Sequence, residues 1–168
     1  MVSWQLFPRS ARPCSALQSV ISVFESNLPS IDSASQTLES NEVLRIVANQ
    51  LRSAGFIVEE GKAKESKIAV PVLFGLNGAI EKSFFADAFH PSEGVVLEVE
   101  AGRAVDNNQF LKDLFQACMM QDANHLAICV RNSYRGGNDF EKVLRFLDTM
   151  YASQRLRLPL HSILLLGY

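Results

Sequence analysis

The sequence predicts an α/β protein in which helices flank a central mixed β-sheet. Apolar residues recur at helical spacing in an early segment and again in the last third. The middle of the chain consists of short runs rich in β-branched and aromatic residues, separated by glycine and proline. The last third alternates helix and strand patterns, which is typical of a sheet covered by helices on both faces.

Residues 1–32 are predicted to form an N-terminal extension that contains one short helix. Residues 1–14 look irregular because two prolines interrupt them. The apolar residues between 20 and 28 then indicate a short amphipathic helix, and Pro29 is expected to end it.

Residues 33–168 are predicted to form the α/β core. A capping-box pattern at 33–36 opens a helix whose apolar stripe continues to Ala54, with Gly55 as its stop signal. Strands follow at 56–60, 67–74, 80–90 and 95–101. Pro71 makes its strand an edge strand or an irregular one.

The last third is predicted to run helix, strand, helix, strand. A capping-box-like start at 106–109 opens the first helix. The strands are expected at 125–131 and 161–168, with the second helix between them, after 135–139. The apolar face of the first helix is expected to consist of Phe110, Leu111, Leu114, Phe115 and Cys118.

Bulk composition excludes several classes of protein. The chain has 168 residues, 48% hydrophobic and 20% charged, which is the composition of a soluble globular domain with a real core. Its net charge of -2 argues against a broad basic surface but allows a local patch. Three cysteines without metal-ligand spacing exclude a zinc finger and a disulfide framework. Without a signal-peptide or membrane-span pattern, we expect a cytoplasmic protein that does not enter a membrane.

Three carboxylates are predicted to converge on one patch of the sheet. Glu98 and Glu100 share one face of their strand because side chains alternate with a period of two. A symmetric hairpin around the turn 91–94 places Asp87 opposite Glu98. Like charges in this arrangement are destabilising, whereas a hard divalent cation such as Mg²⁺ takes oxygen ligands and neutralises them.

Two interpretations of these acids are open. The carboxylates form either the solvated face of an edge strand or a metal site. Asp87 lies between Phe85 and Phe89 on its strand face, an unusual setting for a merely solvated acid. The strand with Glu98 also runs into a helix start, where phosphate groups bind well. Both observations favour the metal site.

The order of these acids resembles the PD-(D/E)xK nuclease superfamily over residues 33–168. On this resemblance Asp87 matches the motif aspartate, Glu98 the motif acid and Glu42 the acid of the preceding helix. Glu100 stands where most members carry lysine, as in the restriction endonuclease branch with glutamate or glutamine there. The resemblance implies a restriction endonuclease-like core and Mg²⁺-dependent hydrolysis of phosphodiester bonds, with Mn²⁺ as a substitute. It also implies double-stranded DNA, in preference to RNA, as substrate and a homodimer as the working form.

The missing lysine leaves several roles open. Glu100 is either a second metal ligand or the general base, and Lys112 or Arg103 is either a migrated cation or a solvated side chain. Glu42 either completes the metal site or lies on the solvated edge of its helix. Phosphate contacts are expected from Arg103, Lys112, Arg131 and Arg135, with Tyr134 as a stacking surface.

Two other functions remain as alternatives. The first is a catalytically inactive, nuclease-like module that binds nucleic acid or a protein partner. The second is an α/β protein with a different ligand, whose acids are only exposed. Metal binding distinguishes the last from the first two, and turnover distinguishes an enzyme from an inactive module.

Overall fold

The protein folds around a six-stranded mixed sheet, seen in a computed structural model that describes residues 1–61, 66–102, 104–105 and 108–168. The sheet order is β1-β8-β7-β6-β5-β2. Strands β6, β7 and β8 run parallel to one another, while β1, β5 and β2 pair antiparallel with their neighbours. The strands are β1 (Ser3–Phe7), β2 (Ile57–Val58), β5 (Ala88–His90), β6 (Val95–Glu100), β7 (His125–Val130) and β8 (Ser162–Gly167).

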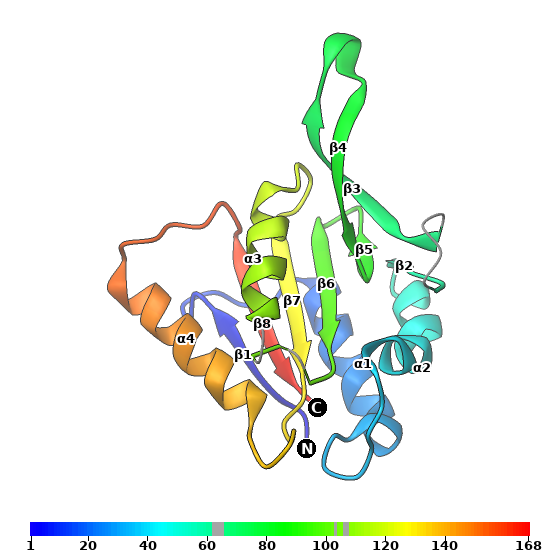
Figure 1. The fold of residues 1–168 in the computed structure, drawn as a ribbon, viewed down its shortest axis with the longest axis vertical. Helices are drawn as coiled ribbons and strands as arrows, with labels where there is room; N and C mark the ends of the chain where they lie inside the picture. The colour runs from blue at the N-terminus through cyan, green and yellow to red at the C-terminus, as the bar shows by residue number, and fades with distance from the viewer. Residues whose placement is uncertain (62–65, 103, 106–107) are drawn as a thin grey trace.

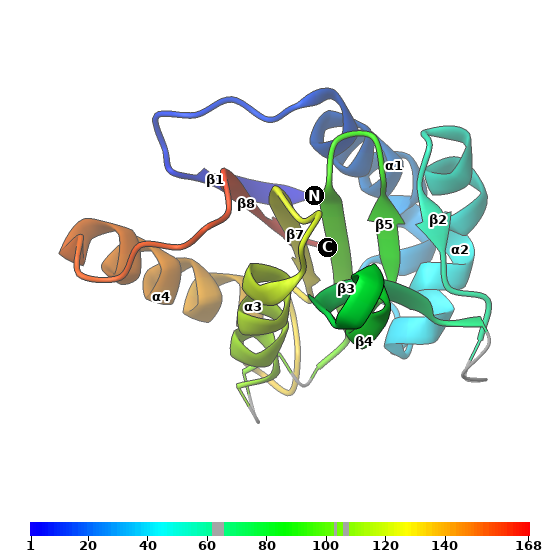
Figure 2. The same cartoon turned by 90° about the horizontal axis from the view of Figure 1, so that it is seen from above.

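Helices cover both faces of the sheet (Figure 2). Helices α1 (Ser15–Ile31) and α2 (Ser40–Ser53) pack on one face, and α3 (Gln109–Met119) and α4 (Asp139–Ser153) pack on the other. Each pair closes its own apolar core against the sheet. The predicted α/β class, with a mixed sheet flanked by helices, is therefore confirmed. None of the described helices is both long and apolar enough to cross a membrane.

Alternation along β6 decides where its acids point. Val95, Leu97 and Val99 are buried in the core beneath α1 and α2, whereas Val96 is buried in the core beneath α3 and α4. Successive side chains of a strand point to opposite faces. Glu98 and Glu100 therefore share the face of Val96 and lie toward α3.

A long hairpin projects from the body of the protein (Figure 1). Its strands β3 (Ile68–Phe74) and β4 (Ile80–Ala86) form a separate two-stranded sheet. The base of the hairpin is anchored to the body of the protein. Val70 and Ala86 are buried there, and the backbone N–H of Gln121 donates a 2.9 Å hydrogen bond to the Pro71 carbonyl. The sheet register shifts after Pro71, which confirms that this strand is irregular.

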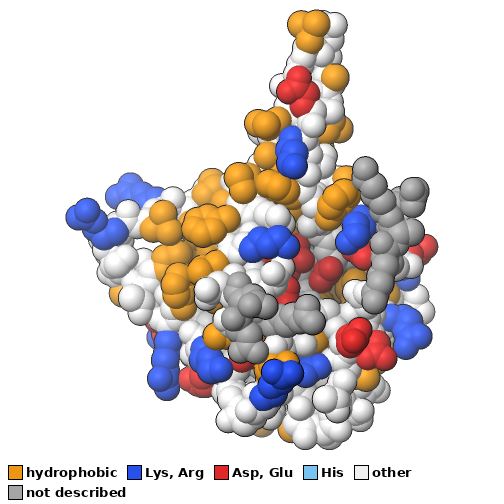
Figure 3. Space-filling model, in the orientation of Figure 1, with side chains coloured by type: hydrophobic (Ala, Val, Ile, Leu, Met, Phe, Trp, Pro, Cys, Tyr) orange, Lys and Arg blue, Asp and Glu red, His pale blue; other side chains and the backbone are white. Residues whose placement is uncertain are grey.

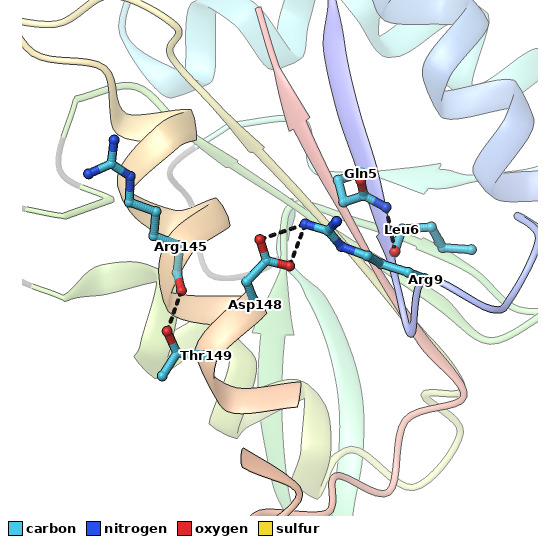
Figure 4. Close-up of polar contacts among 6 residues, drawn as sticks. All are labelled: Gln5, Leu6, Arg9, Arg145, Asp148 and Thr149. Carbon is cyan, nitrogen blue, oxygen red and sulfur yellow. Dashed lines mark hydrogen bonds and ion pairs between the residues drawn. The ribbon is translucent and has the colours of Figure 1, made fainter. Parts of the chain in front are cut away.

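The N-terminal segment belongs to the sheet. The prediction that residues 1–14 are irregular is wrong for Ser3–Phe7, which form β1 and pair with β8 at one sheet edge. The prolines lie beyond this strand, so they do not interrupt its ladder. Arg9 then fastens the following loop to α4 through two 2.6 Å contacts with the Asp148 carboxylate (Figure 4). The segment predicted as an extension thus contributes a strand and, in α1, a core helix.

Helix boundaries also differ from the prediction. Helix α2 begins at Ser40 rather than near Ser33, because Glu39 and Glu42 form the capping box. Helix α1 continues past Pro29 to Ile31, whose side chain is buried in the core. Helix α3 begins after Asn108, and the predicted cap residues Asp106 and Asn107 lie outside the described residues.

Candidate functional site

An acidic cavity of about 310 Å³ lies between the base of the hairpin, β6 and α3. Its floor is the end of β6 on the α3 face, where apolar residues give way to glutamates. In Figure 3 acidic side chains lie in a hollow with basic side chains on either side. The polar residues around the cavity are Ser40, Glu59, Lys67, Asp87, Glu98, Glu100, Gln109, Lys112, Asp113 and Gln116.

Asp87 sits at a break between β4 and β5. The predicted hairpin register is confirmed for Ala88 with Leu97 and the two pairs beyond it, but Asp87 leaves the ladder and does not pair with Glu98. Its carboxylate accepts a 2.8 Å hydrogen bond from the Val99 N–H instead, and its backbone carbonyl accepts one from Glu59. Burial raises the Asp87 pKa to about 6, because the bond from Val99 offsets the desolvation only in part.

Glu98 and Glu100 are half-buried on one face of β6, as predicted. Burial, followed by the charges of Asp87 and Asp113, raises the Glu98 pKa well above its ordinary value. Burial and the adjoining Asp113 carboxylate raise the Glu100 pKa to about 8. The structure therefore brings together the three acids proposed from the sequence, in a setting that penalises their negative charge.

Two further acids line the cavity and were missed from the sequence: Glu59, which pairs with Lys67, and Asp113 on α3. Only 5% of the Asp113 surface is exposed, and burial raises its pKa. Its Oδ1 accepts a long 3.4 Å contact from Gln109, while its Oδ2 has no hydrogen-bond partner. The buried stripe of α3 is Phe110, Asp113, Leu114 and Ala117, and the predicted face was wrong in including Phe115, which is 50% exposed. The sequence did carry a signal for this residue, because Asp113 follows Phe110 by three positions and therefore lies on the apolar stripe of the helix.

Two lysines lie at the rim of the cavity. Lys112 on α3 is exposed, and its charge lowers the pKa values of Glu98, Glu100 and Asp113 against the larger effect of burial. Lys67 sits 3.8 Å from the Glu59 carboxylate. The structure thus places Lys112 beside the acids, as the sequence suggested, and adds Lys67. Arg103, the other candidate cation, lies outside the described residues.

Glu42 does not join the acidic cavity. Its carboxylate accepts a 2.8 Å hydrogen bond from the Glu39 N–H and completes the capping box of α2. The assignment of Glu42 to the metal site is therefore not supported by its position, since a capping role accounts for this side chain. Ser40 reaches the cavity instead, and its hydroxyl accepts a 2.9 Å hydrogen bond from the Ala101 N–H.

The predicted phosphate contacts Arg131 and Arg135 enclose Tyr134. Each guanidinium carbon lies 5.2 Å from the Tyr134 ring centre. Arg131 is buried and donates a hydrogen bond to the Leu38 carbonyl, so it braces the loop before α2. Arg135 is exposed. The guanidinium groups of two arginines therefore already contact the Tyr134 ring, which the sequence suggested as a stacking surface for bases.

The donors in the cavity suit a hard cation. They are carboxylate oxygens, which Mg²⁺ and Mn²⁺ prefer, and the unpartnered Oδ2 of Asp113 is a polar atom that needs a proton or a cation. Among the described residues, however, no three Asp, Glu, His or Cys side chains already stand close enough to enclose a metal ion. The acids line the cavity without forming a closed shell, so the side chains must turn toward an ion in order to hold it.

Comparisons with protein-family models and with curated protein sequences give no match for this chain. The functional assignment therefore depends on the residues and geometry of the acidic cavity. That geometry combines a concave site, several carboxylates with raised pKa values and cations at its rim. Such a combination is typical of functional sites.

Proposed function

We propose that this chain is a metal-dependent endonuclease of the PD-(D/E)xK type that hydrolyses phosphodiester bonds in double-stranded DNA. The observation that carries the proposal is the convergence of Asp87, Glu98 and Glu100 in one cavity at the end of β6. The coarse architecture supports the proposal, because the resemblance also implies a mixed sheet flanked by helices.

Asp87 and Glu98 are the proposed metal ligands. Asp87 is held in place by the Val99 N–H, which leaves its second carboxylate oxygen for a ligand. Glu98 lies in the same cavity and extends from the adjacent strand. A bound Mg²⁺ supplies positive charge that neutralises a phosphodiester and eases deprotonation of water.

Lys112 is the proposed phosphate contact at this centre. Its side chain is exposed at the rim and its charge already acts on Glu98, Glu100 and Asp113. An ammonium group at this position attracts the phosphate backbone and offsets the negative field of the acids. Arg135 is exposed and is a second proposed contact, while Arg131 positions the adjoining loop.

The proposal is tested by cleavage of supercoiled plasmid in Mg²⁺, Mn²⁺ or EDTA. We expect nicking that requires the metal. Glu98→Gln should lower the rate by about a hundredfold or more, because metal-ligand charge contributes several kcal/mol to such reactions. Glu81→Gln, which changes an exposed acid on the hairpin, is the matched control and should cleave like the native chain. Absence of cleavage with either metal, or equal rates for native chain and Glu98→Gln, contradicts the proposal.

A second candidate is a nuclease-like module that binds a partner without cleaving. The observation that favours it is the projecting hairpin, where Leu73, Phe74, Leu76 and Ile80 are each at least 50% exposed. Exposed apolar patches of this kind mark interaction sites. Metal binding without turnover on plasmid or RNA would support this candidate over the nuclease.

A further inference from the structure

Asp113 is the acid in the cavity whose position is hardest to explain by folding alone. It lies on the buried stripe of α3, between Phe110 and Leu114, where an apolar residue would be favoured. Only 5% of its surface is exposed, and its Oδ2 has no hydrogen-bond partner. Among the described residues, no lysine or arginine forms an ion pair with it.

The unpartnered oxygen of Asp113 points to a ligand in the cavity. Asp113 lines the same cavity as Asp87, Glu98 and Glu100. Its charge acts on each of these three acids, and its carboxylate adjoins that of Glu100. A buried pair of carboxylates is strongly unfavourable unless a proton or a cation lies between the two groups.

We propose that Asp113 is a metal ligand and that, with Glu100, it holds a second divalent cation beside the ion assigned to Asp87 and Glu98. This inference rests on the proposed function, and it gives Glu100 the role of a ligand rather than a base. The four acids come from three elements that meet at the cavity: the β4–β5 break, β6 and α3. Oxygen ligands from such separate elements are suited to Mg²⁺ or Mn²⁺, whose remaining positions are filled by water and phosphate.

A cation accounts for the arrangement better than a shared proton. A shared proton joins only Asp113 and Glu100, whereas the same cavity also holds the carboxyl oxygens of Asp87 and Glu98, which that proton does not reach. Two divalent ions balance the carboxylates of Asp87, Glu98, Glu100 and Asp113, and Lys67 pairs with the fifth acid of the cavity, Glu59. The exposed ammonium of Lys112 at the rim would attract a phosphate toward such ions.

The test counts bound Mn²⁺ by titration calorimetry on the full chain at neutral pH. We expect two Mn²⁺ ions for the native protein. Asp113→Asn should lose one of them or bind it about tenfold to a hundredfold more weakly. Asp148→Asn, which makes the same change on α4 outside the cavity, should retain both ions.

Stability in EDTA separates loss of a ligand from loss of the fold. Asp113→Asn removes one buried negative charge without changing the shape of the side chain, so its metal-free melting temperature should equal or exceed that of the native chain. A variant that is folded by this criterion and still binds two Mn²⁺ ions with native affinity overturns the inference.

The outcomes also distinguish this inference from the proposed function. A native chain that binds one Mn²⁺ and cleaves DNA, with the same binding in Asp113→Asn, overturns the role of Asp113 and leaves the nuclease in place. A native chain that binds no Mn²⁺ overturns both. Metal binding that depends on Asp113, in a chain that cleaves nothing, supports the site and contradicts the nuclease.

Discussion

The Asp87 carboxylate accepts a hydrogen bond from the backbone N–H of Val99 at 2.8 Å. This bond joins the break between β4 and β5 to the residue that separates Glu98 from Glu100 on β6. It uses one oxygen of Asp87 to fix the orientation of the carboxylate. The fold thereby holds three acids around one space although the strand pairing itself ends at Ala88 and Leu97.

Stability without metal should fall as pH rises from 6.5 to 8.5. Glu100 has a folded-state pKa of about 8 against an ordinary value of 4.5, so the folded chain binds more protons than the unfolded chain in this range. Stability is then highest below the unfolded pKa and is lost as pH rises through the folded pKa. We expect a decrease of several degrees in melting temperature in EDTA, measured by circular dichroism.

Glu100→Gln is the control for this pH dependence. It removes the titrating group, so its melting temperature should vary less over the same range. Burial lowers the His125 pKa from 6.5, so His125 gives a slope of opposite sign that fades above pH 6.5, where the unfolded chain also loses this proton. A native melting temperature that is constant or rises from pH 6.5 to 8.5 in EDTA would show that the acids are not held in a desolvated site.

Lys112→Gln should weaken catalysis more than it changes folding. The side chain is exposed, so its loss should change stability by less than about 0.5 kcal/mol. If its ammonium contacts phosphate, cleavage at saturating Mg²⁺ should drop by about tenfold to a hundredfold. Lys142→Gln, on the exposed side of α4, provides the matched control in the same plasmid assay. Equal losses of cleavage rate in the two variants would mean that Lys112 acts only through the net charge of the protein.

Glu42→Ala should affect stability and not catalysis. Its carboxylate caps α2 through the Glu39 N–H, and loss of such a cap costs about 0.5–2 kcal/mol. Urea unfolding measures this loss, with Glu25→Ala on the exposed side of α1 expected to cost less than about 0.5 kcal/mol. A large loss of cleavage by folded Glu42→Ala would return this residue to the metal site.

The alternation of helix and strand was sufficient to predict the α/β class and the strands β7 and β8, and the run of β-branched residues at 95–101 predicted β6. These strands are nearly continuous apolar runs because helices cover both of their faces. Strand β1 was not predicted because it is short. It has five residues, of which only Leu6 and Phe7 are buried, so its sequence shows no clear alternation of apolar and polar residues. Its position is fixed by pairing with β8, at the far end of the chain.

The site was predictable where its residues are neighbours in sequence. Glu98 and Glu100 share a face by strand geometry, and the 91–94 turn sets the register that brings Asp87 near them. Asp113 was not found because its significance depends on which side of α3 meets β6, a tertiary relationship. Glu42 differs from the other acids for a local reason: helix α2 begins at Ser40, so the Glu42 side chain completes the capping box of that helix.

Gly94→Ala should destabilise the protein more than Gly78→Ala does. Both glycines have positive φ, +64° and +77°, so both variants carry the left-handed strain of about 1–2 kcal/mol. A Cβ on Gly94 would in addition collide with the Asp122 carbonyl and lie 2.6 Å from the Asn124 side-chain nitrogen, whereas Gly78 faces open space. Because the Gly94 carbonyl also accepts hydrogen bonds from Asn124 and His125, a shift there disturbs the start of β6 against β7. Urea unfolding should show a loss about 1–3 kcal/mol larger for Gly94→Ala, from overpacking added to strain. Equal losses would mean that the turn before β6 can change its backbone conformation without a free-energy cost, and that other contacts hold the pairing of β5 with β6.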